Sequence, residues 1–333
     1  MRSLSTIQKA FIALIIANII WGAAAPIFKF SLQNIPPFTL AFWRFFLAIF
    51  ILLPLAWKHM DLKLASRQDA ILLFCYGFFG ITVNILFFFW GLQRTYAINS
   101  PIITSGQPIM TLLFAMLFLR EKFFVNKFIG MLLGTLGILV IVIEPLLLGG
   151  VNGSILGNMF LVVATIAAVG QTIVGKKIIN KYDPWAFTVW AFIIGSASFL
   201  PLAVYEFIHI PNLYPSISFQ GYFGIGYGAL FSSAAGYGLF GWGLSKITAT
   251  DASLFSYVDP VVGTIVAFFL LHEPITAPFV LGATLIFGGI FIAEGRLNYH
   301  PIRKIIALGQ TIIDEIPHKK ISKKAVLASI FKR

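Results

Sequence analysis

An internal repeat is the feature of this chain that most constrains its fold. Residues between positions 88 and 137 recur 152 positions later, with no gap in the offset. The recurring pairs are Phe88 and Phe240, Trp90 and Trp242, Gly91 and Gly243, Leu92 and Leu244, Ala97 and Ala249, Pro108 and Pro260, Ala115 and Ala267, Leu119 and Leu271, Glu121 and Glu273, Gly130 and Gly282, and Gly137 and Gly289. These segments are long and apolar, and a membrane protein built from two related halves typically carries its site between them.

The composition indicates a membrane protein. Hydrophobic residues make up 59% of the chain and charged residues 11%, whereas an ordinary soluble domain has about 25% charged residues. The one cysteine, Cys75, excludes an intramolecular disulfide and a cysteine-rich metal site. The net charge of +12 lies in short loops and in the C-terminal segment, so we predict no nucleic-acid partner.

Ten apolar segments are long enough to cross a bilayer as helices, which takes about 20 residues. They are residues 10–31, 37–57, 70–93, 99–119, 125–146, 154–175, 184–207, 220–243, 251–271 and 277–296. The first segment runs past Ala23, Ala24 and Ala25, which imitate a signal-peptide cleavage site, so we predict a retained helix. The predicted fold class is therefore all-α integral membrane, with ten transmembrane helices.

Lysine and arginine residues give the predicted orientation. With the N-terminus inside, 21 of the 24 Lys and Arg residues fall on the cytoplasmic side, as the positive-inside tendency requires. We therefore predict a multi-pass protein of the inner (plasma) membrane with both termini cytoplasmic. Residues 10–146 and 154–296 then hold five helices each, an odd number, so the two repeats are inverted relative to each other. The beginnings of the halves also align, with Lys29 matching Lys176.

Several short motifs mark the helices of the two halves. They are Trp21 and Gly22 with Lys29; Trp43, Arg44 and Phe45; Pro108 with Glu121, Gly130, Gly134 and Gly137; and Pro260 with Glu273, Gly282 and Gly289. In order and pattern these motifs resemble the drug/metabolite transporter superfamily, specifically its EamA-type ten-helix transporters. The second half departs from the pattern, because Ala191 stands where the first half has its arginine. The resemblance implies secondary transport, often efflux, of amino acids, nucleotide-like metabolites or drugs.

Arg44 lies within the second predicted helix, about 10 Å below its outer end at 1.5 Å per residue. An ionisable group at that depth usually faces a cavity or a partner. Arg44 can contact an anion or carboxylate, which its guanidinium fork suits, or it can snorkel to the outer headgroups. Lys29 is nearer the end of its helix, where snorkelling is the simpler explanation.

Gln107-Pro108 and Asp259-Pro260 occupy equivalent positions in the fourth and ninth segments. Proline frees a carbonyl one turn earlier in a helix, and a free polar group in lipid must find a partner. We predict two opposed, broken helices that place Gln107 and Asp259 in a substrate or ion site. Asp259 can also carry a coupling proton, because removal from water favours the neutral carboxyl group. The alternative is a structural kink, with Asp259 bonded to a neighbouring helix.

Four residues in the middle of predicted helices are further candidates for the site. Trp21, Asn84, Tyr237 and Tyr257 can line a polar, aromatic cavity suited to a small amphipathic solute. Taken singly, each can instead be an interhelical hydrogen-bonding or packing residue. The same two explanations apply to Gln171.

Nothing in the sequence indicates catalysis or a bound cofactor. Glu121 and Glu273 end the fourth and ninth segments, where each can cap the helix that follows, so we assign them a structural role. The histidines form no helical pair suited to a metal, and no phosphate-binding glycine loop is present. Residues 297–333 are basic, with isoleucines roughly on one helical face. They predict an amphipathic cytoplasmic tail on the anionic inner leaflet, or else a disordered basic tail.

Together these features predict a secondary transporter, and specifically an exporter, of small polar or amphipathic metabolites such as amino acids. It would work by alternating access around a midplane cavity. The predicted partners are the lipid bilayer, a small-molecule solute and a coupling proton. One alternative is an integral-membrane enzyme acting on lipid-linked substrates, which would need clustered carboxylates or histidines that the sequence lacks. The other is a scaffold or receptor, for which an inverted duplication gives no reason.

Overall fold

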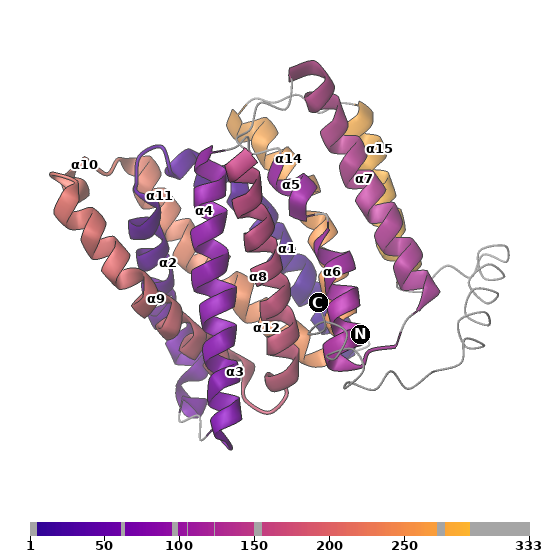
Figure 1. Cartoon of the computed structure of the whole chain (residues 1–333), viewed down its shortest axis with the longest axis horizontal. Helices are drawn as coiled ribbons and strands as arrows, with labels where there is room; N and C mark the ends of the chain where they lie inside the picture. The colour runs from indigo at the N-terminus through magenta and orange to yellow at the C-terminus, as the bar shows by residue number, and fades with distance from the viewer. Residues whose placement is uncertain are drawn as a thin grey trace, which may run out of the picture.

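The computed structural model describes residues 5–60, 64–94, 99–104, 106–122, 124–149, 155–271 and 277–293, and every regular element within those ranges is a helix. These helices form one bundle (Figure 1). The predicted tail at 297–333 and Glu273 lie outside the described residues. The expected all-α fold is confirmed for the part of the chain that the structure describes.

The first half of the bundle begins at a well-capped helix. Its elements are α1 (Thr6–Ser31), α2 (Pro37–Ala56), η1 (Trp57–His59), α3 (Arg67–Gly77), η2 (Phe78–Val83), α4 (Asn84–Arg94), α5 (Asn99–Thr104), α6 (Gln107–Phe114), η3 (Ala115–Leu119) and α7 (Val125–Gly149). The Gln8 N–H donates to the Ser5 hydroxyl and the Ser5 N–H donates to the Gln8 side chain, a capping box that starts α1. Pro37 begins α2, where proline loses no hydrogen bond.

The second half resembles the first in its opening pair of long helices and in the π-helical segment between two later helices, and it differs in its short elements. Its elements are α8 (Ile155–Ile178), α9 (Pro184–His209), α10 (Leu213–Ser216), α11 (Phe219–Tyr227), η4 (Gly228–Ala235), α12 (Gly236–Lys246), α13 (Ala249–Leu254), η5 (Phe255–Tyr257), α14 (Val258–Leu271) and α15 (Ala277–Ala293). Proline again begins the second long helix, and the Asp183 carboxylate accepts backbone N–H bonds from Trp185 and Ala186 in its first turn. Both η2 and η4 are π-helical.

Six helical spans are long and apolar enough to cross a membrane. They are Thr6–Ser31, Pro37–His59, Arg67–Arg94, Met159–Ile178, Pro184–His209 and Ala249–Leu270. Each matches one of the ten predicted segments. The other four segments contain the shorter helices α5 and α6, the helix α7, the helices α11 and α12, and α15. The count of ten transmembrane helices stays a prediction.

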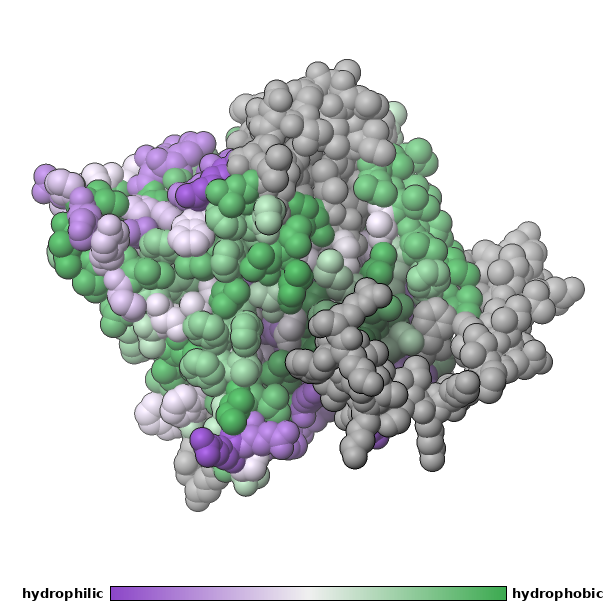
Figure 2. Space-filling model, in the orientation of Figure 1, coloured by the Kyte–Doolittle hydropathy of each residue, from purple (hydrophilic) through white to green (hydrophobic). Residues whose placement is uncertain are grey.

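The outer surface of the described bundle suits lipid better than water. Large apolar side chains are widely exposed on it, among them Leu117 at 73%, Phe219 at 80% and Phe269 at 72%. In the view of Figure 2, apolar residues cover much of the middle of the molecule and hydrophilic residues gather toward the upper left and lower edges. Contiguous exposed apolar surface of this kind marks a membrane-facing or interaction surface.

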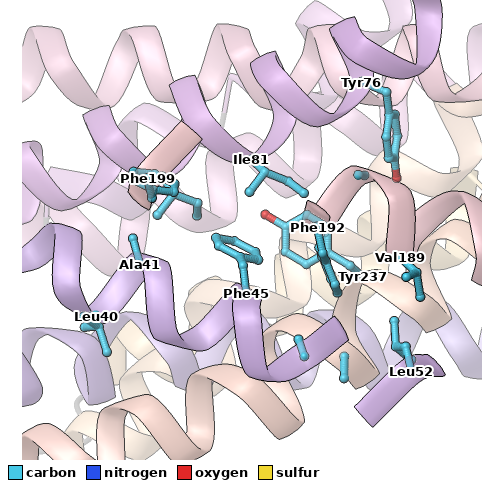
Figure 3. Packing of buried hydrophobic residues seen from close by; sticks show 14 of the residues in the cluster. Leu40, Ala41, Phe45, Leu52, Tyr76, Ile81, Val189, Phe192, Phe199 and Tyr237 are labelled. Carbon is cyan, nitrogen blue, oxygen red and sulfur yellow. The ribbon is translucent and has the colours of Figure 1, made fainter. Parts of the chain in front are cut away.

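The largest buried cluster joins the two halves of the chain. Its aromatic centre is Phe45 of α2, whose ring centre lies 5.4 Å from that of Phe192 and 6.4 Å from that of Phe199, both on α9. Ile81 of η2 and Tyr237 of α12 complete this centre (Figure 3). Because Phe45 is fully buried here, its neighbour Arg44 is held at the boundary between the halves.

Glycines allow α7 and α15 to touch backbone to backbone. A Cβ placed on Gly130 would lie 2.5 Å from the Gly289 carbonyl oxygen, and a Cβ on Gly137 would lie 2.5 Å from that of Gly282. The two contacts pair the earlier glycine of one helix with the later glycine of the other, so the helices run antiparallel, side by side in Figure 1. Small residues at such a crossing give close van der Waals packing in lipid.

Gly289→Ala is expected to destabilise the protein, whereas Gly288→Ala one residue earlier is not. The new methyl group at 289 would lie 2.5 Å from the Gly130 carbonyl oxygen, while a Cβ at 288 meets nothing within 4 Å. Overpacking of this kind costs about 1–3 kcal/mol. Thermal unfolding of both variants in detergent checks this, and equal melting temperatures would show that the α7–α15 crossing gives way easily.

Candidate functional site

The boundary between the halves holds a buried arginine. Arg44 on α2 is 1% exposed. Its Nε donates to the Ser233 hydroxyl and its Nη2 to the Ser232 hydroxyl, each at 3.0 Å, and both serines lie on η4 of the second half. Gly228 lets η4 approach, because a Cβ there would lie 2.9 Å from the Arg44 Cβ. The sequence thus brings a charged side chain of one half onto hydroxyl groups of the other.

Two aromatic rings lower the free-energy cost of burying this charge. Arg44 Cζ lies 4.6 Å from the ring centres of Phe28 and of Phe45. A cation over an aromatic face gains about 2 kcal/mol when desolvated, and placing arginine at the centre of a membrane helix costs about 2.5–3.5 kcal/mol on insertion scales. The rings offset much of that cost, so Arg44 points into the bundle. The snorkelling alternative does not describe Arg44 in this structure.

Trp21 of α1 shares a partner with Arg44. Its Nε1 donates to the Ser232 carbonyl oxygen at 3.0 Å, on the same residue whose hydroxyl accepts from Arg44. The Trp21 ring centre lies 5.2 Å from that of Tyr237, which in turn lies 6.0 Å from that of Phe45. The structure therefore brings together three of the predicted site residues, namely Trp21, Arg44 and Tyr237.

Ser232 and Ser233 are site residues that the sequence analysis missed. Both are buried within the π-helical segment η4. π-Helical turns are rare and often occur at functional sites. The available signal was a pair of adjacent hydroxyl residues inside the apolar segment 220–243. Serines in membrane helices commonly pack helices together, so that pair alone did not indicate contact with Arg44.

One of the two predicted helix breaks is present as an interruption, and the other is a 3-10 turn within a continuous helical span. α5 ends at Thr104 and α6 begins at Gln107. In the second half α13 ends at Leu254, the 3-10 turn η5 follows, and α14 begins at Val258, so Asp259 lies in its first turn. Each proline therefore stands at the start of a new helix, where its missing N–H is tolerated.

Asp259 lies against α1, beside the residue that follows Trp21. A Cβ on Gly22, the residue after Trp21, would lie 2.5 Å from the Asp259 carbonyl oxygen. The Oδ1 atom of Asp259 is buried and has no hydrogen-bond partner among the described residues. Within the same residues no ion pair joins Asp259 to Arg44. Asp259 therefore contacts α1 at Gly22, and neither Asp259 nor Arg44 has an ion-pair partner among the described residues.

Tyr257 and Asn84 lie in contacts between helices. The Tyr257 hydroxyl donates to the Met131 carbonyl oxygen at 2.8 Å and lies 2.8 Å from the Thr135 hydroxyl, both on α7. The Asn84 Nδ2 donates to the Ala164 carbonyl oxygen at 2.9 Å, which joins α4 to α8. These contacts fit the interhelical alternative for both residues, and contact with a solute stays a prediction.

Gln171 packs between helices as well. Its side chain lies against Gly80 of η2, where a Cβ would overlap it. Its Nε2 atom is buried without a hydrogen-bond partner in the described part of the chain.

Equivalent lysines of the two halves make equivalent bonds. Lys29 Nζ donates to the Leu92 carbonyl oxygen, and Lys176 Nζ donates to the Leu244 carbonyl oxygen at 2.8 Å. Each lysine near the end of one long helix thereby caps the carboxyl end of another, where a cation is favoured. Lys29 therefore has a partner inside the bundle.

Glu121 caps a helix, but not the one that follows it. Its carboxylate accepts from the Ala249 N–H at 2.8 Å, from the Thr250 N–H at 3.3 Å and from the Thr250 hydroxyl at 2.7 Å. These groups open α13 in the second half, whereas the sequence analysis expected the next helix, α7. Carboxylates stabilise helix N-termini wherever tertiary structure delivers them.

Matches to known proteins cover both halves. The EamA-like transporter family matches residues 8–143 and again residues 155–294. An uncharacterized transporter of Archaeoglobus fulgidus is 31% identical over 292 residues, 86% of this chain and 98% of that protein. The uncharacterized transporter YetK of Bacillus subtilis is 26% identical over 287 residues, 85% of this chain and 86% of its own.

One solved structure has the same fold. This crystal structure aligns with a TM-score of 0.69 over 87% of this chain and 99% of its own, at 14% sequence identity. The family match spans the two predicted repeats and agrees with the resemblance of the sequence motifs. The chain therefore belongs to the EamA-like transporter family, whose members are membrane transporters.

Proposed function

We propose that this membrane transporter is a secondary carrier that exports small polar or amphipathic metabolites such as amino acids. The observation that carries the proposal is the cluster of Trp21, Arg44 and Tyr237, because it joins polar and aromatic groups from both halves deep inside an apolar bundle. Carriers of this architecture bind their solute between the halves and expose it to each side in turn. Gln107, after the interruption between α5 and α6, and Asp259, in the first turn of α14, belong to the same proposed site.

An inverted repeat is part of this proposal. Two pairs of contacts between equivalent residues support it, and so does one shared feature of the backbone. Lys29 and Lys176 cap equivalent carbonyl groups, equivalent glycines cross reciprocally between α7 and α15, and η2 and η4 are π-helical at overlapping equivalent positions. Reciprocal contact between equivalent residues is the signature of an approximate two-fold axis.

Two carboxylates, each bonded to a helix N-terminus of the other half, are candidates for gates. Glu206 of α9 accepts from the Thr39 N–H at 2.6 Å and from the Phe38 N–H at 3.2 Å, in the first turn of α2. Glu121 accepts the same kind of bonds from the backbone N–H groups of Ala249 and Thr250, at the start of α13. In the proposed topology Glu206 lies at the outer end of the bundle and Glu121 at the inner end. Alternating access would break one set of bonds while the other holds.

Counterflow in proteoliposomes tests the proposed carrier. Vesicles loaded with an unlabelled amino-acid mixture should take up a labelled amino acid transiently above equilibrium, because only a carrier exchanges one solute for the other. A panel of labelled amino acids and small organic acids would cover the proposed solute class. Protein-free vesicles are the control, and uptake that never exceeds equilibrium for any solute would contradict the proposal. The membrane-enzyme alternative gains no support from relatives that are named transporters.

Both termini are expected in the cytoplasm. The asymmetry of lysine and arginine residues carries this prediction. A reporter enzyme that is active only in the periplasm should stay inactive when it is fused after Arg333, and a reporter active only in the cytoplasm should be active there. Strong periplasmic activity would overturn both the ten-helix count and the inverted repeat.

A further inference from the structure

We propose that Arg44, Ser232 and Ser233 form a binding site for a monovalent anion, and that this anion is the carboxylate of the transported solute. The second part rests on the proposed carrier function. The first part rests on the hydrogen-bonding groups of the site alone.

The positive charge of Arg44 is not neutralised by the described protein. A guanidinium has five N–H donors, and Arg44 uses one on Ser233 and one on Ser232. Its other donors meet no acceptor among the described residues. The ion pairs found there, Lys127 with Asp251 and Lys181 with Asp69, involve other residues. A buried cation held by neutral hydroxyls leaves its charge available to a ligand.

The serines add donors beside those of the arginine. Each hydroxyl oxygen accepts from Arg44, so its own O–H is directed elsewhere, and neither serine donates to an acceptor in the described part of the chain. Guanidinium N–H and hydroxyl O–H groups side by side recognise an anion, and a guanidinium can hold both oxygens of a carboxylate. A cationic group would be repelled there, and a neutral group would leave the charge of Arg44 uncompensated.

The aromatic surroundings indicate what the carboxylate is attached to. Phe28 and Phe45 each present a ring to Arg44 at 4.6 Å, and Trp21 and Tyr237 lie beyond, with ring centres 5.2 Å apart. Apolar rings around a polar anchor favour a solute with one anionic end and an apolar body. Chloride is the other source of a monovalent anion, and experiment separates the two.

Thermal unfolding of the full chain in detergent tests the site directly, in sulfate buffer of constant ionic strength. The probes are sodium acetate, sodium phenylacetate, neutral phenylacetamide and sodium chloride. Phenylacetate is expected to raise the melting temperature saturably, by about 5 °C near a hundred times its Kd, and acetate to do so at higher concentration. Phenylacetamide should produce no shift, because it lacks the charge.

Variants test whether the shift in melting temperature arises from anion binding at Arg44 and the two serines. Arg44→Gln should abolish the shift, while Arg94→Gln should preserve it, because Arg94 is exposed and lies 5.9 Å from the Trp90 ring. If Arg44→Gln fails to fold, Ser233→Ala keeps the charge, removes one hydroxyl and should weaken anion affinity about tenfold. An equal shift with phenylacetamide, or a shift that survives in the variants, would overturn the site.

The outcomes also separate the site from the carrier function. A shift with chloride but with neither carboxylate, lost in Arg44→Gln, supports the anion site and overturns the solute carboxylate as its ligand. Anion-dependent stabilisation without counterflow of any solute supports the site and contradicts the carrier. Counterflow without anion-dependent stabilisation supports the carrier and overturns the anion site.

Discussion

Arg44→Lys is expected to lower the transport rate of a carboxylate-bearing solute at least about tenfold, the cost of losing one charge-assisted hydrogen bond. Lysine keeps the positive charge. Its single ammonium group cannot donate to the hydroxyls of both Ser232 and Ser233 and also present two parallel N–H donors to the solute carboxylate. Initial rates of counterflow in proteoliposomes, at several solute concentrations, measure the loss.

The matched control is Arg94→Lys, which changes the same side chain at an exposed position and should transport at the wild-type rate. Reconstituted amounts and melting temperatures of both variants show whether each is folded. Near-normal apparent affinity in Arg44→Lys would mean that Arg44 supports the fold and does not recognise the solute.

Asp259→Asn is expected to yield folded protein whose transport no longer depends on pH. The Oδ1 atom of Asp259 is buried without a partner among the described residues, and asparagine keeps the shape while removing the titratable group. Gln107, an amide, stands at the equivalent position of the first half, so an amide suits the start of such a helix. If turnover requires a proton on Asp259, wild-type transport falls as pH rises, and the variant shows no such fall.

Rates measured with and without a pH gradient, at a series of pH values, test this expectation. Glu273→Gln serves as the comparison and should alter the pH profile less. A wild-type rate and pH profile in Asp259→Asn would reduce this aspartate to a structural partner of α1. Coupling would then reside elsewhere, or the carrier would be a facilitator.

Features with a local cause were predictable from the sequence. The interruption before Gln107 and the change from 3-10 to α-helix before Asp259 both coincide with the prolines beside these residues. The burial of Arg44 was not predictable, because nearly every position of its helix is apolar and no polar face shows which side meets the bundle. The contact of Glu121 with Ala249 was out of reach as well, since 128 positions separate the two residues and only tertiary packing joins them.

The segment 99–119 shows what a sequence pattern averages over. In the structure it is divided between α5 and α6, so no single described helix in it reaches the length that a bilayer crossing requires. A hydropathy window over the sequence runs across such an interruption.

The π-helical segments bear on the ancestry of the chain. A π-helix closes its hydrogen bonds between residues i and i+5, one residue more than the α-helix. Moved forward by the 152-residue offset of the repeat, η2 (Phe78–Val83) falls within η4 (Gly228–Ala235). If the two halves arose by duplication, as the proposed repeat implies, this shared position would be older than the duplication. The third π-helical segment, η3 (Ala115–Leu119), would be younger, because residues 267–271 at the same offset lie in the α-helix α14.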